Sequence, residues 1–285
     1  MNRLKTFFLM ALLTAIFLLL GGLIAGNEGL AVALIMALAV NFFSYWFSDR
    51  IAISMTRSQP LRESDAPEVY RALRELTHNA GMPMPRLYLM PTEQPNAFAT
   101  GRNPQNAVIA VTAGLLRALD YEELKGVLAH ELAHIHNRDI LIGSVAAAVA
   151  GALMFVARIG MWSGAVGGSR RNQSGAALGL IRLVALLLAP FAALLVQMSI
   201  SRTREYGADA TGARFSGNPQ GLAGALAKME QHARRRPMHR INEAAAHMFI
   251  VNPFSAKGLS ALFSTHPPIE DRIARLQQMQ MGGGR

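Results

Sequence analysis

The pattern of hydrophobic positions separates the chain into long apolar stretches and polar segments. The apolar stretches cover residues 7–24, 30–47, 140–157 and 183–200. Each is about 18 residues long, close to the length that a helix needs to cross the hydrocarbon core of a membrane. The pattern therefore predicts four transmembrane helices in two pairs. The last two stretches are rich in Ala and Gly, and for them a buried core helix is the alternative interpretation.

The order of these stretches predicts four parts. Residues 1–48 form an N-terminal transmembrane hairpin, and residues 140–200 form a second one. Residues 49–139 and 201–285 form two soluble parts. The first apolar stretch is longer than the roughly 7–15 residues of a signal-peptide core, and a second stretch follows it closely. We therefore expect an uncleaved hairpin rather than a removed leader.

The polar segment between the two hairpins predicts a small unit of helix and strand. Residues 65–81 have the period of an amphipathic helix. Residues 86–90 and 107–112 resemble short strands because they are rich in Leu, Tyr, Val and Ile, and residues 96–100 are a candidate third strand. The fold class expected is a mainly α membrane protein with a small β-sheet.

A further helix carries the sequence His130-Glu131-Leu132-Ala133-His134. Asp120 and Glu123 have the spacing of a capping box and mark its start. Four residues of a helix span about 400°, so His130 and His134 share one face and can hold one metal ion. Glu131 lies about 100° to the side, within reach of a water molecule on that metal. This is the H-E-x-x-H signature of zinc proteases.

A catalytic zinc ion usually has three protein ligands and one open position. Glu205 is the best candidate for the third ligand. His134 lies six residues before the third apolar stretch, and Glu205 lies five residues after the fourth. Two antiparallel membrane helices would bring both residues to the same membrane face. If its helix continues into the third stretch, His134 lies about 9 Å before the start of that stretch. Asp209, one turn after Glu205, would accept a hydrogen bond from the far nitrogen of a histidine ligand, which we expect to be His130.

Composition and charge support a membrane protein and suggest an orientation. The chain is 51% hydrophobic and 16% charged, with a net charge of +10 and no cysteine, which excludes a disulfide framework. Arginine and lysine flank the first hairpin but are absent from the turn at 26–29, so both ends of that hairpin are expected in the cytoplasm. The three arginines between residues 158 and 171 conflict with this topology, which places them outside.

The positive net charge raises a second class of partner. A basic protein can bind nucleic acid. The basic run at 234–236 has no aromatic platform beside it, however, so attraction to anionic lipid is the better explanation. We expect the lipid bilayer as a partner and no nucleic acid.

The chain resembles the HtpX family of bacterial membrane zinc endopeptidases, which belongs to the gluzincin group together with the CAAX prenyl proteases. The matching segments are Pro-Asn-Ala-Phe-Ala at 95–99, His-Glu-Leu-Ala-His at 130–134, Glu-Tyr-Gly-Ala-Asp at 205–209 and Thr-His-Pro-Pro at 265–268. Their order and spacing fit along almost the whole chain. The resemblance implies a gluzincin-like zinc protease domain combined with four transmembrane helices.

The resemblance also implies an activity and a place in the cell. It implies one Zn²⁺ per chain, with Glu205 completing the ligand set. It implies a multi-pass protein of the bacterial inner membrane whose active site faces the cytoplasm. The substrates would be polypeptides, in particular misfolded or damaged membrane proteins, cleaved without ATP.

Four further residues enter only through this resemblance. Asn96 and Ala97 would lie on an edge strand beside the cleft and bind an extended substrate by strand addition. For Asn96, a role as a turn residue after Pro95 is equally open. His266 and Arg272 would help to hold the oxyanion or the cleft, and a structural role for each is equally open.

Two other functions stay open at this point. A membrane scaffold or adaptor with a structural zinc site would need a fourth protein ligand, which His266 could supply. A nucleic-acid binder at the membrane is a weaker alternative. The sequence does not define the oligomeric state.

Overall fold

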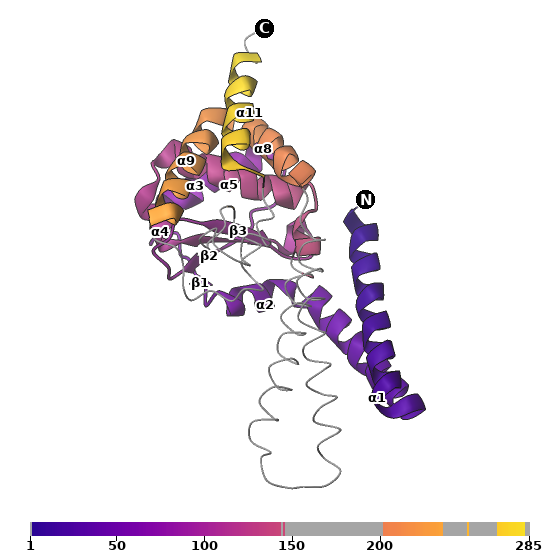
Figure 1. Cartoon of the computed structure of the whole chain (residues 1–285). Coiled ribbons are helices and arrows are strands. Elements are labelled where there is room, and N and C mark those ends of the chain that lie inside the picture. Colours follow the sequence, from indigo (N-terminus) through magenta and orange to yellow (C-terminus); the bar gives the residue numbers. More distant parts are fainter. Residues whose placement is uncertain (1, 144, 146–201, 236–249, 251–266, 283–285) are drawn as a thin grey trace.

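The computed structural model describes residues 2–143, 145, 202–235, 250 and 267–282 of the 285-residue chain. In these residues a mainly helical domain with a small mixed sheet lies beside a long N-terminal helical hairpin (Figure 1). The prediction of a mainly α protein with a small sheet is confirmed at this level. The fourth apolar stretch, and most of the third, lie outside the described residues.

The sheet has four strands in the order β1-β2-β4-β3. The two central strands, β2 (Arg86–Met90) and β4 (Val108–Thr112), are parallel. The two edge strands, β1 (Gln59–Pro60) and β3 (Ala97–Thr100), each run antiparallel to their central neighbour. All three predicted strands are confirmed to within one residue. The sequence analysis missed β1 because a strand of two residues has no alternation to detect.

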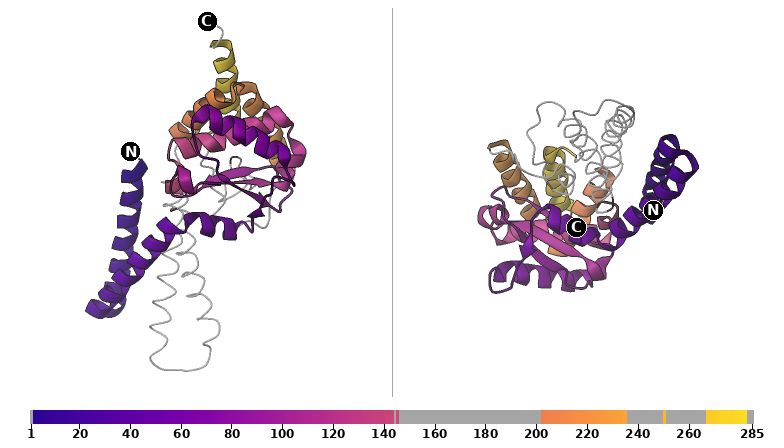
Figure 2. Two further views of the ribbon diagram at one scale, coloured as in Figure 1. Left: turned by 180° about the vertical axis from the view of Figure 1, so that it is seen from behind. Right: turned by 90° about the horizontal axis from the view of Figure 1, so that it is seen from below.

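The two faces of the sheet are covered by different helices (Figure 2). Helix α2 (Ser48–Met55) packs Ala52 against Phe98 and other apolar residues of one face. The main core lies on the opposite face, where α3 (Pro67–Ala80) and α5 (Tyr121–His136) pack. Every residue of β4 is buried, which explains its continuous apolar sequence.

Helix α5 is the central helix of the domain. Helices α8 (Arg202–Ser216) and α9 (Pro219–Arg235) pack directly on it, and α11 (Ile269–Gly282) packs on both of them (Figure 1). The short helix η1 (Pro104–Asn106) connects β3 to β4, and α4 (Ala113–Ala118) connects β4 to α5.

Glycines allow the backbone of α5 to lie in direct contact with the backbones of α8 and α9. A Cβ atom on Gly126 of α5 would lie 2.4 Å from the backbone nitrogen of Leu222 in α9. A Cβ atom on Gly212 of α8 would lie 2.9 Å from the backbone nitrogen of His130. Since packed interiors have little free space, a larger residue at either position must push two helices apart.

Helix α1 (Asn2–Trp46) folds back on itself as a hairpin (Figures 1 and 2). The chain reverses at Gly26, whose φ of 58° is the left-handed conformation that glycine adopts easily. The side-chain amide of Asn41 joins the two arms, because it donates to the carbonyl of Met10 at 3.2 Å and to the hydroxyl of Thr14 at 3.0 Å.

The second arm of α1 has the properties of a membrane span. Among the described helices, the segment Gly26–Trp46 is long and apolar enough to cross a membrane. Large apolar side chains on the hairpin are exposed, for example Phe7, Ile35 and Phe42. One described span thus meets the criterion that the sequence analysis applied to four.

We predict that Gly126→Ala destabilises the domain by about 1–3 kcal/mol, because the added methyl group must separate α5 from α9. Gly207→Ala in α8 is the matched control, since nothing lies within 4 Å of its Cβ position. The control should gain up to about 1 kcal/mol from higher helix propensity. Thermal unfolding of the purified chain measures both variants, and equal midpoints would contradict the close packing.

Candidate metal centre

Local sequence explains why α5 begins where it does. The Asp120 carboxylate accepts a hydrogen bond from the backbone nitrogen of Glu123 at 3.0 Å, and the Glu123 carboxylate accepts one from the backbone nitrogen of Asp120 at 3.0 Å. The predicted capping box is therefore confirmed. It starts the helix so that His130 and His134, one turn apart, both face α8.

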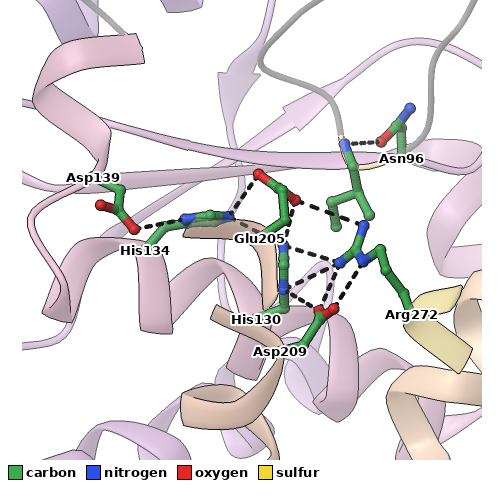
Figure 3. A network of polar contacts seen from close by, with 8 residues as sticks. Asn96, His130, His134, Asp139, Glu205, Asp209 and Arg272 are labelled. Atoms are coloured by element: carbon green, nitrogen blue, oxygen red, sulfur yellow. Dashed lines mark hydrogen bonds and ion pairs between the residues drawn. The ribbon is translucent and has the colours of Figure 1, made fainter. Parts of the chain in front are cut away.

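Three side chains converge where α5 meets α8 (Figure 3). The Nε2 atoms of His130 and His134 are 3.1 Å apart. One carboxylate oxygen of Glu205 lies 3.7 Å from Nε2 of His130, and the other lies 3.7 Å from Nε2 of His134. One ligand atom from each residue falls within 4.8 Å of the others. The structure thus brings together two residues of α5 and one residue that lies about 70 positions later.

The far nitrogen of each imidazole faces a carboxylate. Nδ1 of His130 lies 2.9 Å from Oδ1 of Asp209, and Nδ1 of His134 lies 3.3 Å from Oδ2 of Asp139 (Figure 3). A carboxylate at Nδ1 holds the proton on that atom and leaves the Nε2 lone pair free to bind a metal. Both histidines are therefore oriented as metal ligands.

The geometry fits a small divalent cation. A tetrahedral ion with ligand distances of 2.0–2.2 Å separates its ligand atoms by about 3.3–3.6 Å. The separations of 3.1 and 3.7 Å among His130, His134 and Glu205 bracket this range. The residues present therefore fit a metal ion.

Arg272 of α11 contacts two of the carboxylates at the centre. Its side chain has no exposed surface. The guanidinium group donates two hydrogen bonds to Asp209, at 2.9 and 2.7 Å, and lies 3.7 Å from a carboxylate oxygen of Glu205. Of the two roles left open for Arg272, these contacts match the structural one, and they leave its proposed role at the oxyanion or the cleft untested. Arg272 joins the carboxylate that orients His130 to the carboxylate that faces both histidines.

Glu131 is buried beside the same cluster, with 2% of its surface exposed. Burial raises the pKa of Glu131 to about 7, and the charge of Glu205 acts in the same direction. The charge of His134 and a hydrogen bond from the backbone of Ala99 oppose that rise in pKa. A carboxylate with a pKa near neutral can both accept and release a proton at physiological pH.

Burial and neighbouring charges together shift the pKa values of the other groups. Burial lowers the pKa of His130 to about 4 and keeps its imidazole neutral. Burial also opposes charge on His134, but the hydrogen bond to Asp139 and the charge of Glu205 raise its pKa to about 9. Burial alone would raise the pKa of Asp209, but the charge of Arg272 together with the hydrogen bonds from His130 and Arg272 lowers it to about 2. The acids around His134 therefore favour a positive charge at the centre.

Asn96 lies just before the edge strand β3 and is fully buried. Its side-chain oxygen accepts hydrogen bonds from the backbone nitrogens of Ala97, at 3.1 Å, and Ile250, at 3.0 Å (Figure 3). Its own backbone nitrogen donates to the hydroxyl of Thr112 at 2.9 Å. Asn96 thus fixes the start of β3, and Ala97 begins that strand. His266 lies outside the described residues.

Two features of the centre were absent from the sequence analysis. Asp139 was not selected, although a carboxylate five residues after the second histidine could have signalled a partner for it. The ion pair of Arg272 with Asp209 was also missed. Because 63 residues separate the two, no local sequence pattern predicts it.

Comparison with known proteins identifies close relatives. The profile of peptidase family M48 matches residues 63–280. A protein of Syntrophobacter fumaroxidans named "Protease HtpX homolog" is 53% identical over 282 residues, which cover 98% of this chain and 99% of the relative. Proteins with the same name from Persephonella marina and Thermococcus sibiricus are 50% and 51% identical, and each alignment covers at least 95% of both chains.

A solved structure shares the fold. The crystal structure of S. mikatae Ste24p aligns with a TM-score of 0.51 over 93% of this chain, at 18% sequence identity. The present chain spans 62% of that longer protein.

We predict that Asp209→Asn lowers metal affinity about 10- to 100-fold, because His130 loses the carboxylate that orients it. Asp271→Asn is the matched control, since Asp271 is an exposed acid next to Arg272. Metal retained against a graded series of chelator concentrations, measured by elemental analysis, tests the difference. Equal retention in the two variants would show that Asp209 does not support the ligand.

Proposed function

The chain belongs to peptidase family M48 and is a metalloprotease, and from that premise we propose a zinc-dependent endopeptidase of the bacterial inner membrane. It would hydrolyse peptide bonds of misfolded or damaged membrane proteins on the cytoplasmic side, without ATP. The observation that carries the proposal is the convergence of His130, His134 and Glu205 beside the buried Glu131.

Zinc is the metal that this set of ligands favours. Two imidazole nitrogens and one carboxylate oxygen are a common ligand set of catalytic zinc, and they leave a fourth position open. When bound, zinc would lower the pKa of its water to about 7 and polarise the carbonyl of the scissile bond. We assign His130, His134 and Glu205 to hold one such ion.

Glu131 is the proposed general base. It lies next to the two histidines in the sequence but does not belong to the cluster of ligand atoms. With a pKa raised to about 7, its carboxylate can take a proton from the attacking water and pass it to the leaving amine. The hydrogen bond from the Ala99 backbone holds the carboxylate in place.

The edge strand β3 is the proposed substrate platform. β3 lies at one end of the described sheet and pairs with β4, and the family resemblance places the extended substrate beside this strand by strand addition. Because the backbone of Ala99 in β3 contacts Glu131, a peptide on this edge would lie close to the proposed base. Asn96 and Ala97 would set the position of that edge rather than offer exposed side chains.

Asp209 and Arg272 are proposed as positioning residues. Asp209 holds the tautomer of His130, and Arg272 neutralises the buried carboxylates of Asp209 and Glu205. His266 stays a candidate for transition-state stabilisation through the family resemblance alone.

Membrane anchoring by the α1 hairpin completes the proposal. The segment Gly26–Trp46 has the length and composition of a span, and the apolar stretches at 140–157 and 183–200 would supply a second hairpin. The positive charges that flank the first hairpin favour a cytoplasmic position for the catalytic domain. The two hairpins would hold the active site close to the bilayer, and this position favours membrane proteins as substrates.

The alternative is a membrane scaffold with a structural zinc ion. Such a site is closed by four protein ligands. A buried acid whose pKa is raised to about 7 lies beside the cluster. This acid and membership of a peptidase family favour catalysis over a structural role.

We predict that Glu131→Gln lowers peptide hydrolysis by about 10²- to 10⁴-fold, because the base is lost while the shape of the side chain is kept. One metal ion per chain should remain. Glu205→Gln provides the contrast and should lose both metal and activity. Chelator-sensitive cleavage of an unfolded membrane protein, with elemental analysis of each variant, tests the assignment. Full activity of Glu131→Gln would eliminate the proposed base.

Because the chain contains no cysteine, single cysteines can be introduced and labelled to test the topology. We predict that Asn27→Cys, in the exposed turn of the α1 hairpin, reacts with a membrane-impermeant maleimide in intact spheroplasts. Ser64→Cys, exposed on the catalytic domain, should react only after lysis. The opposite labelling pattern would reverse the proposed orientation.

A further inference from the structure

A basic pocket lies outside the metal centre, on the opposite face of the sheet. It has a volume of about 370 Å³ and opens between α2 and the first residues of β2 and β4. Arg50 and Arg57 line it from α2 and the turn that follows, and Arg86 lines it from β2. The hydroxyl-bearing residues Ser54 and Ser58 lie between the arginines.

The pocket has more positive than negative charge. Asp49 is the one acid among its lining residues, and it forms an ion pair with Arg86 at 2.5 Å. No ion pair to a described carboxylate is formed by Arg50 or Arg57. Two guanidinium groups therefore remain available for an anion, and guanidinium binds phosphate with paired hydrogen bonds.

The backbone at Arg57 supports a role for its side chain. α2 ends in a Schellman motif, in which Ser58 donates to the carbonyl of Ile53 at 3.0 Å and Arg57 donates to that of Ser54 at 3.2 Å. Arg57 has a φ of 53° at the position where glycine is usual. An arginine costs free energy there. Its guanidinium group in the pocket offers a reason for an arginine at this position.

The pocket lies next to the end of the candidate span. α1 ends at Trp46 and α2 begins at Ser48, on the side of the domain from which the hairpin leaves (Figure 1). Aromatic rings cluster at this junction, and the Arg102 guanidinium lies 4.6 Å from the Trp46 ring. Tryptophan and tyrosine are typical of the membrane–water interface. Arg50, four residues after Trp46, would therefore lie at the level of the lipid headgroups.

We propose that this pocket binds the phosphate group of an anionic phospholipid. The arginines and the hydroxyl of Ser54 would hold the phosphate, whereas the hydroxyl of Ser58 is hydrogen-bonded to Thr56 at 2.7 Å. An apolar floor formed by Ile53, Tyr88 and Val108 would receive the adjoining glycerol and the first acyl carbons. The positive headgroup of a zwitterionic lipid would be repelled by the arginines. The proposal rests on the membrane placement of α1 but not on proteolysis.

Native mass spectrometry of the full chain in non-ionic detergent tests the site. Phosphatidylglycerol and phosphatidylcholine with identical acyl chains are the two lipid probes, and inorganic phosphate is the soluble probe. The double variant Arg50→Gln/Arg57→Gln removes the two available guanidinium groups. The control Arg214→Gln/Arg235→Gln removes two exposed arginines from α8 and α9, outside the pocket, with the same change in net charge.

We expect the unmodified chain and the control to bind one phosphatidylglycerol in preference to phosphatidylcholine. The double variant should bind phosphatidylglycerol roughly tenfold more weakly. Equal binding by the double variant, or an equal loss in the control, would overturn the site. If millimolar inorganic phosphate displaced phosphatidylglycerol, the proposal of a lipid ligand would be rejected in favour of a soluble phosphate. A Glu131→Gln chain that still binds phosphatidylglycerol would separate this proposal from that of proteolysis.

Discussion

Buried charges hold the centre of this protein together. Asp209 and Arg272 meet in the interior with almost no exposed surface, and each also touches a group at the metal centre. A buried charge is costly unless its partner is in place. Because the imidazole of His130 comes from α5, the acid from α8 and the guanidinium from α11, none of the three helices can shift alone. The orientation of the proposed ligands depends on this arrangement.

The sheet links this centre to the opposite side of the domain. The edge strand β3 contacts Glu131 through the backbone of Ala99, and Phe98 of the same strand packs against Ala52 in α2. α2 begins two residues after the end of α1. A single short strand therefore separates the proposed catalytic base from the helix that follows the membrane hairpin. The same short strand thus contacts both the buried acid and the helix that follows the α1 hairpin.

Local features of the sequence were enough to predict part of this structure. The spacing of His130 and His134 and the capping box at Asp120 involve neighbours in the chain, so their geometry follows from helix periodicity. Glu205 was selected on the expectation that two antiparallel apolar helices would return the chain to its starting side, and the described residues do place it beside the two histidines. The contacts of Arg272 could not be inferred, since nothing in the pattern of α11 distinguishes it from Arg275, which lies over the ring of Tyr206. Asp139 reaches His134 only through a backbone turn beyond the end of α5.

The long separation between His130 and Arg272 has a consequence for biosynthesis. The guanidinium group that neutralises the acids at the centre enters the chain 142 residues after the histidine. Domains fold from the N-terminal side as the ribosome releases them. A nascent chain that already contains the H-E-x-x-H helix therefore lacks the partner that completes its interior. The buried acids of α8 therefore gain their charge partner only when the C-terminal helix has been synthesised.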